Sequence, residues 1–379
     1  DLTGAVGFGD AIISALPDWS GRIWFASVEG VVGTIDPASG TVASRDLGEP
    51  ISNSFTVDES GDVYLVTDTA MYRLRADGAG VPQTVWRQVY ANDGRRKPGQ
   101  TQAGSGTTPS VTTRHVVITD NADPINVVVY GREDGRFVCQ APVFAAGQSA
   151  TDNSVIATDR SIVVENNHGY TGPASTQNGQ STVGGVERVD VRGGRCVKVW
   201  HSDERAPTSV PKLSLANGLV YVYTKEPRDD GLDGWYLTAI DFDDGRTVYK
   251  RLAGEGLGFN NNYAPITLAP DGDAYVGVLG GMVRLADAVS PAGSPLRLAL
   301  RLRYRRGPRG CARGAVRARI GGRDREALRQ VGFRLGRRLL ATDRRPPFAT
   351  RIPARRLRRG RRHSIAARVR SADGRRARL

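Results

Sequence analysis

The sequence is poor in cysteine, histidine, methionine and lysine, and it has no long apolar run. Its three cysteines and four histidines form no CxxC and no paired His/Cys spacing, which argues against a zinc site. No segment approaches the roughly 18 consecutive apolar residues of a membrane span, so we expect none. No GxSxG, Walker or dinucleotide-binding motif is present, which removes the enzyme classes that these motifs define.

Charge divides the chain into two unlike parts. Residues 296–379 contain 29 arginines, no lysine and four acidic residues, a net charge of +25. Residues 1–295 contain 24 basic and 35 acidic residues, a net charge of −11. The overall figure of +14 therefore describes neither part. Together with the length, this division predicts two domains, residues 1–290 and residues 291–379.

A sustained helical period is also missing, whereas short strand-like segments recur throughout residues 1–290. Six segments are rich in β-branched and aromatic residues, and each follows a short turn that is often Ser-Gly, Asn-Gly or Asp-Gly. They are residues 22–27, 62–67, 115–120, 161–166, 219–224 and 273–278. Repeats of about 48 residues have the size of four-stranded propeller blades.

The expected fold of this region is therefore an all-β, six-bladed β-propeller. The last repeat lacks an obvious outer strand after residues 282–285. The segment Leu2–Phe8 could supply that strand and close the ring. A seventh blade that precedes Asp1 is the alternative.

One repeat resembles a known family. The residues Gly21-Arg-Ile-Trp-Phe and Val32-Gly-Thr-Ile-Asp-Pro-Ala-Ser-Gly40 are similar to a repeat of the streptogramin-lyase-like propellers. The wider class includes the gluconolactonase-like, paraoxonase-like and quinoprotein-like propellers. The resemblance covers about the first three quarters of the chain and implies the fold, while activity varies widely among propellers.

Polar residues are concentrated at one predicted end of the propeller channel. The start of each first strand and the end of each second strand should meet there, around the axis. We expect the ligand-binding residues among amides, carboxylates and lysines at these positions. They are Asn53, Asp68, Asn121, Asn166, Lys212, Lys225, Asn260 and Asn261.

The resemblance to gluconolactonase-like and paraoxonase-like propellers implies a divalent ion at this end, held by one Glu, several Asn and an Asp. Such oxygen ligands suit calcium. Two alternatives stay open: the same residues could cap loop backbones, or they could line a polar pocket without metal. The corresponding residues here are Asp120, Asn153, Glu165, Asn167 and Asn262.

His168 is the histidine closest to this set in sequence, so it is the candidate general base. Residues 94–109 and 169–185 are long Gly-, Ser- and Thr-rich stretches, which act as lids or are insertions. Cys139 and Cys196 fall on or near outer strands of consecutive repeats, so they form either a disulfide or two buried thiols.

The arginine-rich part has the pattern of a folded β-domain. Apolar and polar residues alternate in residues 296–304, 316–320, 331–335, 348–352 and 365–369, which places the arginines on solvent faces. Residues 331–337, 343–348 and 357–363 resemble bacterial Ig-like domains, which implies an Ig-like β-sandwich. Its arginines could contact a polyanion or the acidic propeller, or they could simply form the solvated surface of a spacer.

These observations predict a secreted or cell-envelope protein. The chain starts at Asp1 without a Met, which fits either a mature secreted protein or a trimmed chain. The predicted function is non-catalytic binding of a small molecule or a cell-surface ligand by a monomeric propeller. The Ig-like domain would be a spacer or an anchor to an anionic surface. The alternative is a divalent-metal-dependent hydrolase, lactonase or lyase.

Overall fold

The structure, a computed structural model, describes residues 2–287, 296–307, 311–357, 361–372 and 374–379. The chain forms two compact units, Asp1–Asp287 and Ala288–Leu379. The predicted boundary at residue 290 lies outside the described residues. Within the described residues, the regular secondary structure of each unit consists of β-strands and short 3-10 helices.

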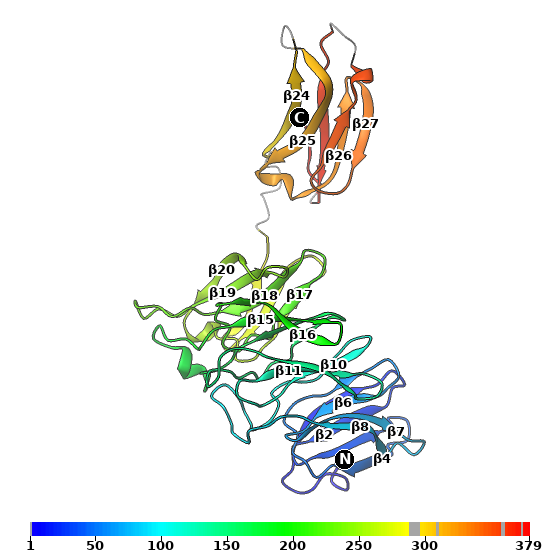
Figure 1. Cartoon of the computed structure of the whole chain (residues 1–379), viewed down its shortest axis with the longest axis vertical. Coiled ribbons are helices and arrows are strands. Elements are labelled where there is room, and N and C mark those ends of the chain that lie inside the picture. Colours follow the sequence, from blue (N-terminus) through cyan, green and yellow to red (C-terminus); the bar gives the residue numbers. More distant parts are fainter. Residues whose placement is uncertain (1, 288–295, 308–310, 358–360, 373) are drawn as a thin grey trace. The chain divides into compact units, whose positions relative to one another are not determined.

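The first unit contains six antiparallel sheets whose strands follow one another in chain order (Figure 1). Each of the six predicted repeat segments forms the second strand of one sheet. The first three sheets consist of β1 (Ile12–Pro17), β2 (Ile23–Ser27), β3 (Val31–Ile35) and β4 (Val42–Asp46); β5 (Thr56–Val57), β6 (Val63–Val66), β7 (Ala70–Ala76) and β8 (Pro82–Val89); and β9 (Ser110–Val111), β10 (His115–Thr119), β11 (Asn126–Gly131) and β12 (Phe137–Pro142).

The next three sheets repeat this order, but the sixth has three strands. The fourth and fifth sheets consist of β13 (Ile156–Ala157), β14 (Ser161–Glu165), β15 (Val186–Arg192) and β16 (Arg195–Ser202); and β17 (Lys212–Ser214), β18 (Leu219–Thr224), β19 (Gly234–Asp241) and β20 (Thr247–Glu255). The sixth consists of β21 (Ile266–Leu268), β22 (Ala274–Val278) and β23 (Gly281–Leu285), and the short helices are η1 (Pro173–Thr176) and η2 (Leu257–Phe259).

The sheets pack face to face through buried apolar side chains. Five hydrophobic clusters each join two successive sheets: Trp24 and Leu65 belong to the first, and Tyr223 and Val276 to the last. Alternation of buried and exposed residues along β8 places one of its faces in the core. The loops at the ends of these sheets are consequently held by a packed scaffold.

The first and sixth sheets differ from this pattern. Within the described residues, no hydrophobic cluster joins the sixth sheet to the first. Residues 2–8 form turns instead of a strand, because glycines interrupt them and the Val6 amide bonds back to the Leu2 carbonyl at 2.9 Å. The described structure therefore does not show the expected closure by Leu2–Phe8, and β23 has no fourth strand beside it.

The second unit contains two antiparallel sheets around one core that includes Phe333 and Ile320. Its apolar residues face inward at every second position, as the alternation predicts. The sheets are β24 (Leu298–Arg306), β25 (Ala312–Gly322) and β28 (Ala349–Ile352); and β27 (Arg338–Asp343), β26 (Leu328–Leu335), β29 (Ile365–Ser371) and β30 (Arg376–Arg378), with short helices η4 (Arg323–Arg325) and η5 (Ala354–Arg356).

Two further predictions concern covalent and membrane features. Cys139 on β12 and Cys196 on β16 form a disulfide, which confirms the first of the two alternatives. Cys311 is free and exposed. No helix among the described residues is long and apolar enough to cross a membrane.

Candidate ligand-binding site

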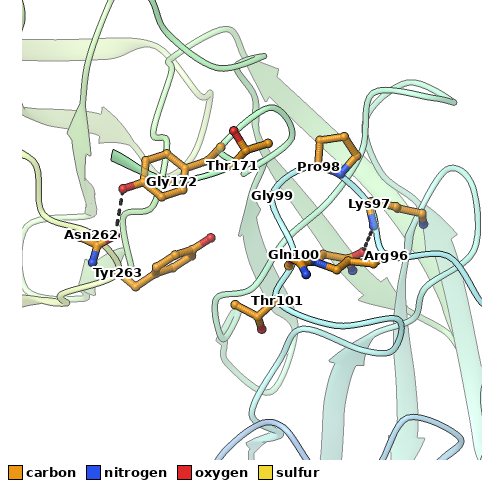
Figure 2. Close-up of a pocket in the computed structure, with 11 residues that line it drawn as sticks. Arg96, Lys97, Pro98, Gly99, Gln100, Thr101, Thr171, Gly172, Asn262 and Tyr263 are labelled. Atoms are coloured by element: carbon orange, nitrogen blue, oxygen red, sulfur yellow. Dashed lines mark hydrogen bonds between the residues drawn. The ribbon is translucent and has the colours of Figure 1, made fainter. Parts of the chain in front are cut away.

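A cavity of about 360 Å³ lies where loops from three parts of the first unit meet. Its walls are residues 96–101 between β8 and β9, residues 170–172 between β14 and β15, and Asn262 with Tyr263 before β21. Figure 2 shows these segments around an open space, with the Tyr263 hydroxyl directed into it. The two long loops predicted as lids or insertions thus supply two of the walls.

Hydrogen bonds hold the wall formed by residues 96–101. The Lys97 amide donates to Gln100 Oε1 at 3.1 Å, and Arg96 Nε donates to the Gln100 carbonyl at 3.0 Å. Burial lowers the pKa of the Lys97 ammonium, which donates to the Asn121 carbonyl at 3.1 Å. The guanidinium of Arg96 is exposed, so it is the cation that a ligand in the cavity can reach.

The same loop is held against residues that flank the fourth sheet. Gly99 has a φ of +104°, and a Cβ there would lie 2.2 Å from the Asn167 carbonyl oxygen, so only glycine fits this approach. The Thr101 amide donates to Asp152 Oδ2 at 2.8 Å. Burial raises the pKa of Asp152 to about 6, and its Oδ1 has no partner among the described residues. The sequence prediction missed Asp152, although it adjoins Asn153.

Two tyrosines form the opposite wall. The buried Tyr170 donates its hydroxyl to Asn262 Oδ1 at 2.9 Å, and its ring meets that of Tyr263 edge to face at 5.5 Å. Asn262 and Tyr263 have φ values of +39° and +68°, a conformation that costs non-glycine residues about 1–3 kcal/mol each. Burial raises the pKa of Tyr263, which keeps its hydroxyl protonated as a hydrogen-bond donor. Such strain is often found at ligand sites.

Glu165 is the centre of a buried polar cluster beside these loops. Asn153 Nδ2 donates to Glu165 Oε1 at 2.6 Å, and Asn167 Nδ2 donates to the same oxygen at 3.3 Å. The two amides also donate to the carbonyls of Ser209 and Pro207. Glu165 Oε2 has no partner among the described residues, and burial raises the pKa of the carboxyl to about 8.

Three of the five predicted metal ligands therefore come together, namely Asn153, Glu165 and Asn167. Both amides turn their nitrogens toward the carboxylate, so the cluster offers few of the 6–8 oxygens that calcium takes. Within the described residues, no group of three His, Cys, Asp or Glu side chains could hold a metal ion. As oriented, these side chains do not offer calcium its set of oxygen ligands, and burial favours the neutral form of Glu165.

The other two predicted ligands have different partners. Asp120 accepts hydrogen bonds from the amide and the side chain of Asn126 at 2.6 and 2.7 Å, and burial raises its pKa. Asn262 accepts the hydroxyl of Tyr170 in the cavity wall. Asp120 thus closes a turn, and Asn262 contributes to the cavity.

Most of the predicted ligand-binding amides stabilise loops. Asn53 donates to the Ser105 carbonyl at 2.8 Å, and Asn121 donates to the Arg95 carbonyl at 3.0 Å. The remaining amides also donate hydrogen bonds to loop residues, and none of them lines this cavity. Asn166 donates to Gln148, Asn260 to Thr176 and Asn261 to Thr208, while Asp68 accepts the Thr69 hydroxyl.

The two predicted lysines lie apart from the cavity lining. Lys225 is fully buried and pairs with Asp233 at 3.1 Å. Lys212 is exposed at the start of β17. Neither is brought together with Glu165 or with the tyrosine wall by any described contact.

His168, the predicted base, is half-buried and does not line the cavity. Its Nδ1 has no partner among the described residues. Burial lowers its pKa, so the ring is neutral at physiological pH. A catalytic role for His168 remains a prediction.

A second histidine, His201, has carboxylate partners on both ring nitrogens. His201 Nδ1 lies 2.9 Å from Oε1 of the buried Glu187, and its Nε2 lies 3.1 Å from Asp203. The register of β15 and β16 places Glu187 directly opposite His201, and both line a cavity of about 470 Å³. Cross-strand pairing was the signal that could have identified this pair.

Six antiparallel sheets packed in chain order, with a cavity among their loops, make the first unit a β-propeller. The chain is similar to BamB from Moraxella catarrhalis, with a TM-score of 0.51, 16% identity and coverage of 82% of this chain and 84% of that one. It is also similar to Sqt1 from Saccharomyces cerevisiae, with a TM-score of 0.49, 11% identity and coverage of 83% of each chain. A candidate 6-phosphogluconolactonase from Bacteroides fragilis has a TM-score of 0.45 and 13% identity, with coverage of 70% of this chain and 76% of that one. At these identities, the likeness to BamB establishes the fold alone.

Sequence comparison adds one relative. The chain is 29% identical over 321 residues to an uncharacterised protein of Archaeoglobus fulgidus, in a match that covers 74% of this chain. The match spans 62% of the relative's length. No protein-family profile matches the chain.

Proposed function

We propose that this chain is a non-catalytic binding protein, a six-bladed propeller followed by an Ig-like β-sandwich, which takes a small polar ligand in the cavity of Figure 2. The observation that carries the proposal is the cavity itself: about 360 Å³ between loops that are fixed by their own hydrogen bonds. Small-molecule sites have volumes of about 300–1,000 Å³ and are usually formed before the ligand binds.

The lining indicates the class of ligand. Tyr263 offers an aromatic face and a hydroxyl, Arg96 offers a guanidinium, and Thr101 and Asn262 add polar atoms. A ring with one apolar face and several hydroxyls can stack on the tyrosine, while a carboxylate on that ring pairs with the arginine. A sugar acid meets these requirements.

Saturation-transfer NMR with a panel of neutral monosaccharides and uronic acids tests this. We expect uronic acids to bind the wild-type chain, Tyr263→Ala to abolish the signal, and Arg96→Gln to weaken acids at least fivefold while sparing neutral sugars. Tyr275→Ala, at a half-buried tyrosine of β22 outside the cavity lining, is the control. Equal binding by wild-type and Tyr263→Ala would remove the cavity as the site.

We also propose that the protein is extracytoplasmic. The Cys139–Cys196 disulfide supports this, since disulfides persist in oxidising compartments. Alkylation of protein taken directly from its native cells, with and without prior reduction, checks the assignment by mass. One alkylated cysteine before reduction and three afterwards is the expected result, and three in both samples would contradict it.

Glu165 favours a second candidate function, a hydrolase or lactonase. A buried carboxyl with a raised pKa is typical of catalytic acids. Hydrolysis of δ-gluconolactone, followed in a pH-stat with and without calcium, tests this candidate. Turnover that disappears in a folded Glu165→Gln variant would favour the enzyme over the binding protein.

A further inference from the structure

Arginines have opposite surroundings in the two units. In the propeller, several arginines on strands pair with carboxylates: Arg73 Nε lies 2.7 Å from Asp62, and Arg188 Nε lies 2.7 Å from Asp190. In the second unit, arginines on adjacent strands lie directly opposite other arginines. Carboxylates of the same chain neutralise the propeller arginines, but they do not neutralise the paired arginines of the second unit.

The strand register of β24, β25 and β28 defines an arginine face on one side of this sheet. Arg301 is opposite Arg319, and Arg303 is opposite Arg317, which is in turn opposite Arg351. All five are exposed, while the alternate residues of β25 are buried in the core. We use the term arginine face for Arg301, Arg303, Arg317, Arg319 and Arg351.

No carboxylate of the described residues pairs with the arginine face. Asp324 accepts the Arg297 amide, Glu326 lies 3.3 Å from Arg325, and Asp343 accepts backbone amides. The remaining acid of this unit, residue 373, lies outside the described residues. Like charges directly opposite on a sheet are destabilising, and guanidinium groups cannot shed their charge by deprotonation.

We propose that the arginine face binds the phosphate backbone of duplex nucleic acid. Neighbouring arginines are about 7 Å apart along a strand and about 5 Å apart across strands. A duplex carries one negative charge per roughly 1.7 Å of its axis, so it is dense enough to neutralise all five together. The guanidinium fork matches phosphate with two parallel hydrogen bonds.

The composition of the face limits how the duplex is read. Every member of the arginine face is an arginine, so the face itself provides no aromatic ring for base stacking. Binding is therefore to the backbone and independent of base sequence. This inference concerns the second unit and goes beyond the proposed sugar-acid site, so either can fail while the other stands.

The test uses the full chain and a 20-base-pair DNA duplex, with fluorescence anisotropy between 50 and 200 mM salt. The quadruple variant Arg301→Gln/Arg303→Gln/Arg317→Gln/Arg319→Gln removes four charges from the arginine face. We expect its affinity at 150 mM salt to fall at least tenfold. We expect the slope of log affinity against log salt to fall by about 3–4, since each phosphate contact contributes about 0.9.

Two matched variants lose the same charge elsewhere. One replaces Arg368, Arg370, Arg376 and Arg378 by Gln on the other sheet of the unit, where they form like-charge pairs too. The two sheets lie about 10 Å apart, further than the screening length of about 8 Å, so this variant should lose less than threefold in affinity. The second matched variant replaces Arg45, Arg114, Arg160 and Arg195, which are exposed on the propeller, by Gln. It should bind DNA as the wild type does.

The melting temperature of the second unit checks that each variant folds, and the arginine-face variant should melt no lower than the wild type. Equal loss in all three variants would mean that net charge, and not this face, drives binding. Tight binding to vesicles with 30% phosphatidylglycerol, or to heparin, without binding to DNA would assign the face to a different polyanion. Each of those outcomes overturns the proposal.

Discussion

At the residue scale, the buried polar side chains near the cavity mainly satisfy one another, and Glu165 is an exception. Its Oε1 accepts two amide nitrogens, whereas its Oε2 has no partner among the described residues. A buried carboxylate that lacks a cation is costly, so the neutral acid is the favoured form. Burial accordingly raises the pKa of Glu165 to about 8.

This raised pKa predicts that the stability of the propeller depends on pH. The variant Glu165→Gln should weaken that dependence. The folded state keeps its proton up to about pH 8, while the unfolded chain releases it near the ordinary value of 4.5. The stabilisation is therefore complete below about pH 4.5 and is lost as the pH rises toward 8. We expect the melting temperature of the variant to change less than that of the wild type between pH 5 and 8, by calorimetry. If the melting temperatures of the two proteins changed equally with pH, this prediction would be wrong.

Calcium provides a second measurement on the same residue. A bound cation would favour the ionised carboxylate, so calcium would raise the melting temperature most at pH 8 and EDTA would reverse the effect. The present hydrogen bonds predict no such rise. A calcium-dependent rise that is absent in Glu165→Gln would establish the metal site instead.

At the element scale, charged side chains in turns tie neighbouring sheets together. Arg132, in the turn after β11, reaches back to the turn between β5 and β6, where it lies 2.9 Å from Asp58 and 2.6 Å from Glu59. The Asp58 side chain is only 1% exposed, and hydrogen bonds from Ser60 and Arg132 outweigh its burial and lower its pKa to about 2. The pair therefore links the second and third sheets.

Arg132→Met should destabilise the propeller by about 3–5 kcal/mol, since it leaves a buried carboxylate without its partner. Urea unfolding at pH 7 measures this loss. Because the pKa of Asp58 is lowered, the stabilisation that it provides is present above about pH 4 and is lost as the pH falls toward 2. The variant should thus lose less stability than the wild type over that acid range.

Arg136→Met is the matched control. Arg136 lies near Asp134 at 3.8 Å on the surface, with 77% of its side chain exposed. Surface pairs of this kind contribute about 0–1 kcal/mol. If Arg136→Met and Arg132→Met cost the same, the link between the second and third sheets is not what stabilises the propeller.

The strands were more predictable from the sequence than the site. The six repeat segments are rich in β-branched and aromatic residues, which favour strands. Each forms a strand whose ends lie within one residue of the predicted ends. The strand β15 gives a weaker local signal, because it follows a long loop and carries Glu187, Arg188 and Asp190. The left-handed backbone at Asn262 and Tyr263 depends on contacts with residues distant in sequence, which no local pattern encodes.

At the scale of the whole molecule, the two units have separate cores and opposite net charges. The disulfide belongs wholly to the propeller, where it joins the outer strands of the third and fourth sheets. Its two cysteines are 57 residues apart in sequence, so the bond closes a long loop in the unfolded chain. Reduction should therefore affect the stability of one unit only.

Calorimetry of the full chain should show two transitions, of which only the propeller transition responds to reductant. Opening a loop of 57 residues removes about 4 kcal/mol of stabilisation, which for a unit of this size lowers its melting temperature by roughly 10 °C. The double variant Cys139→Ala/Cys196→Ala should reproduce the shift without reductant. Cys311→Ser, which removes the exposed free thiol of the second unit, is the control and should leave the propeller transition in place. A single transition that shifts as a whole would instead show that the two units unfold together.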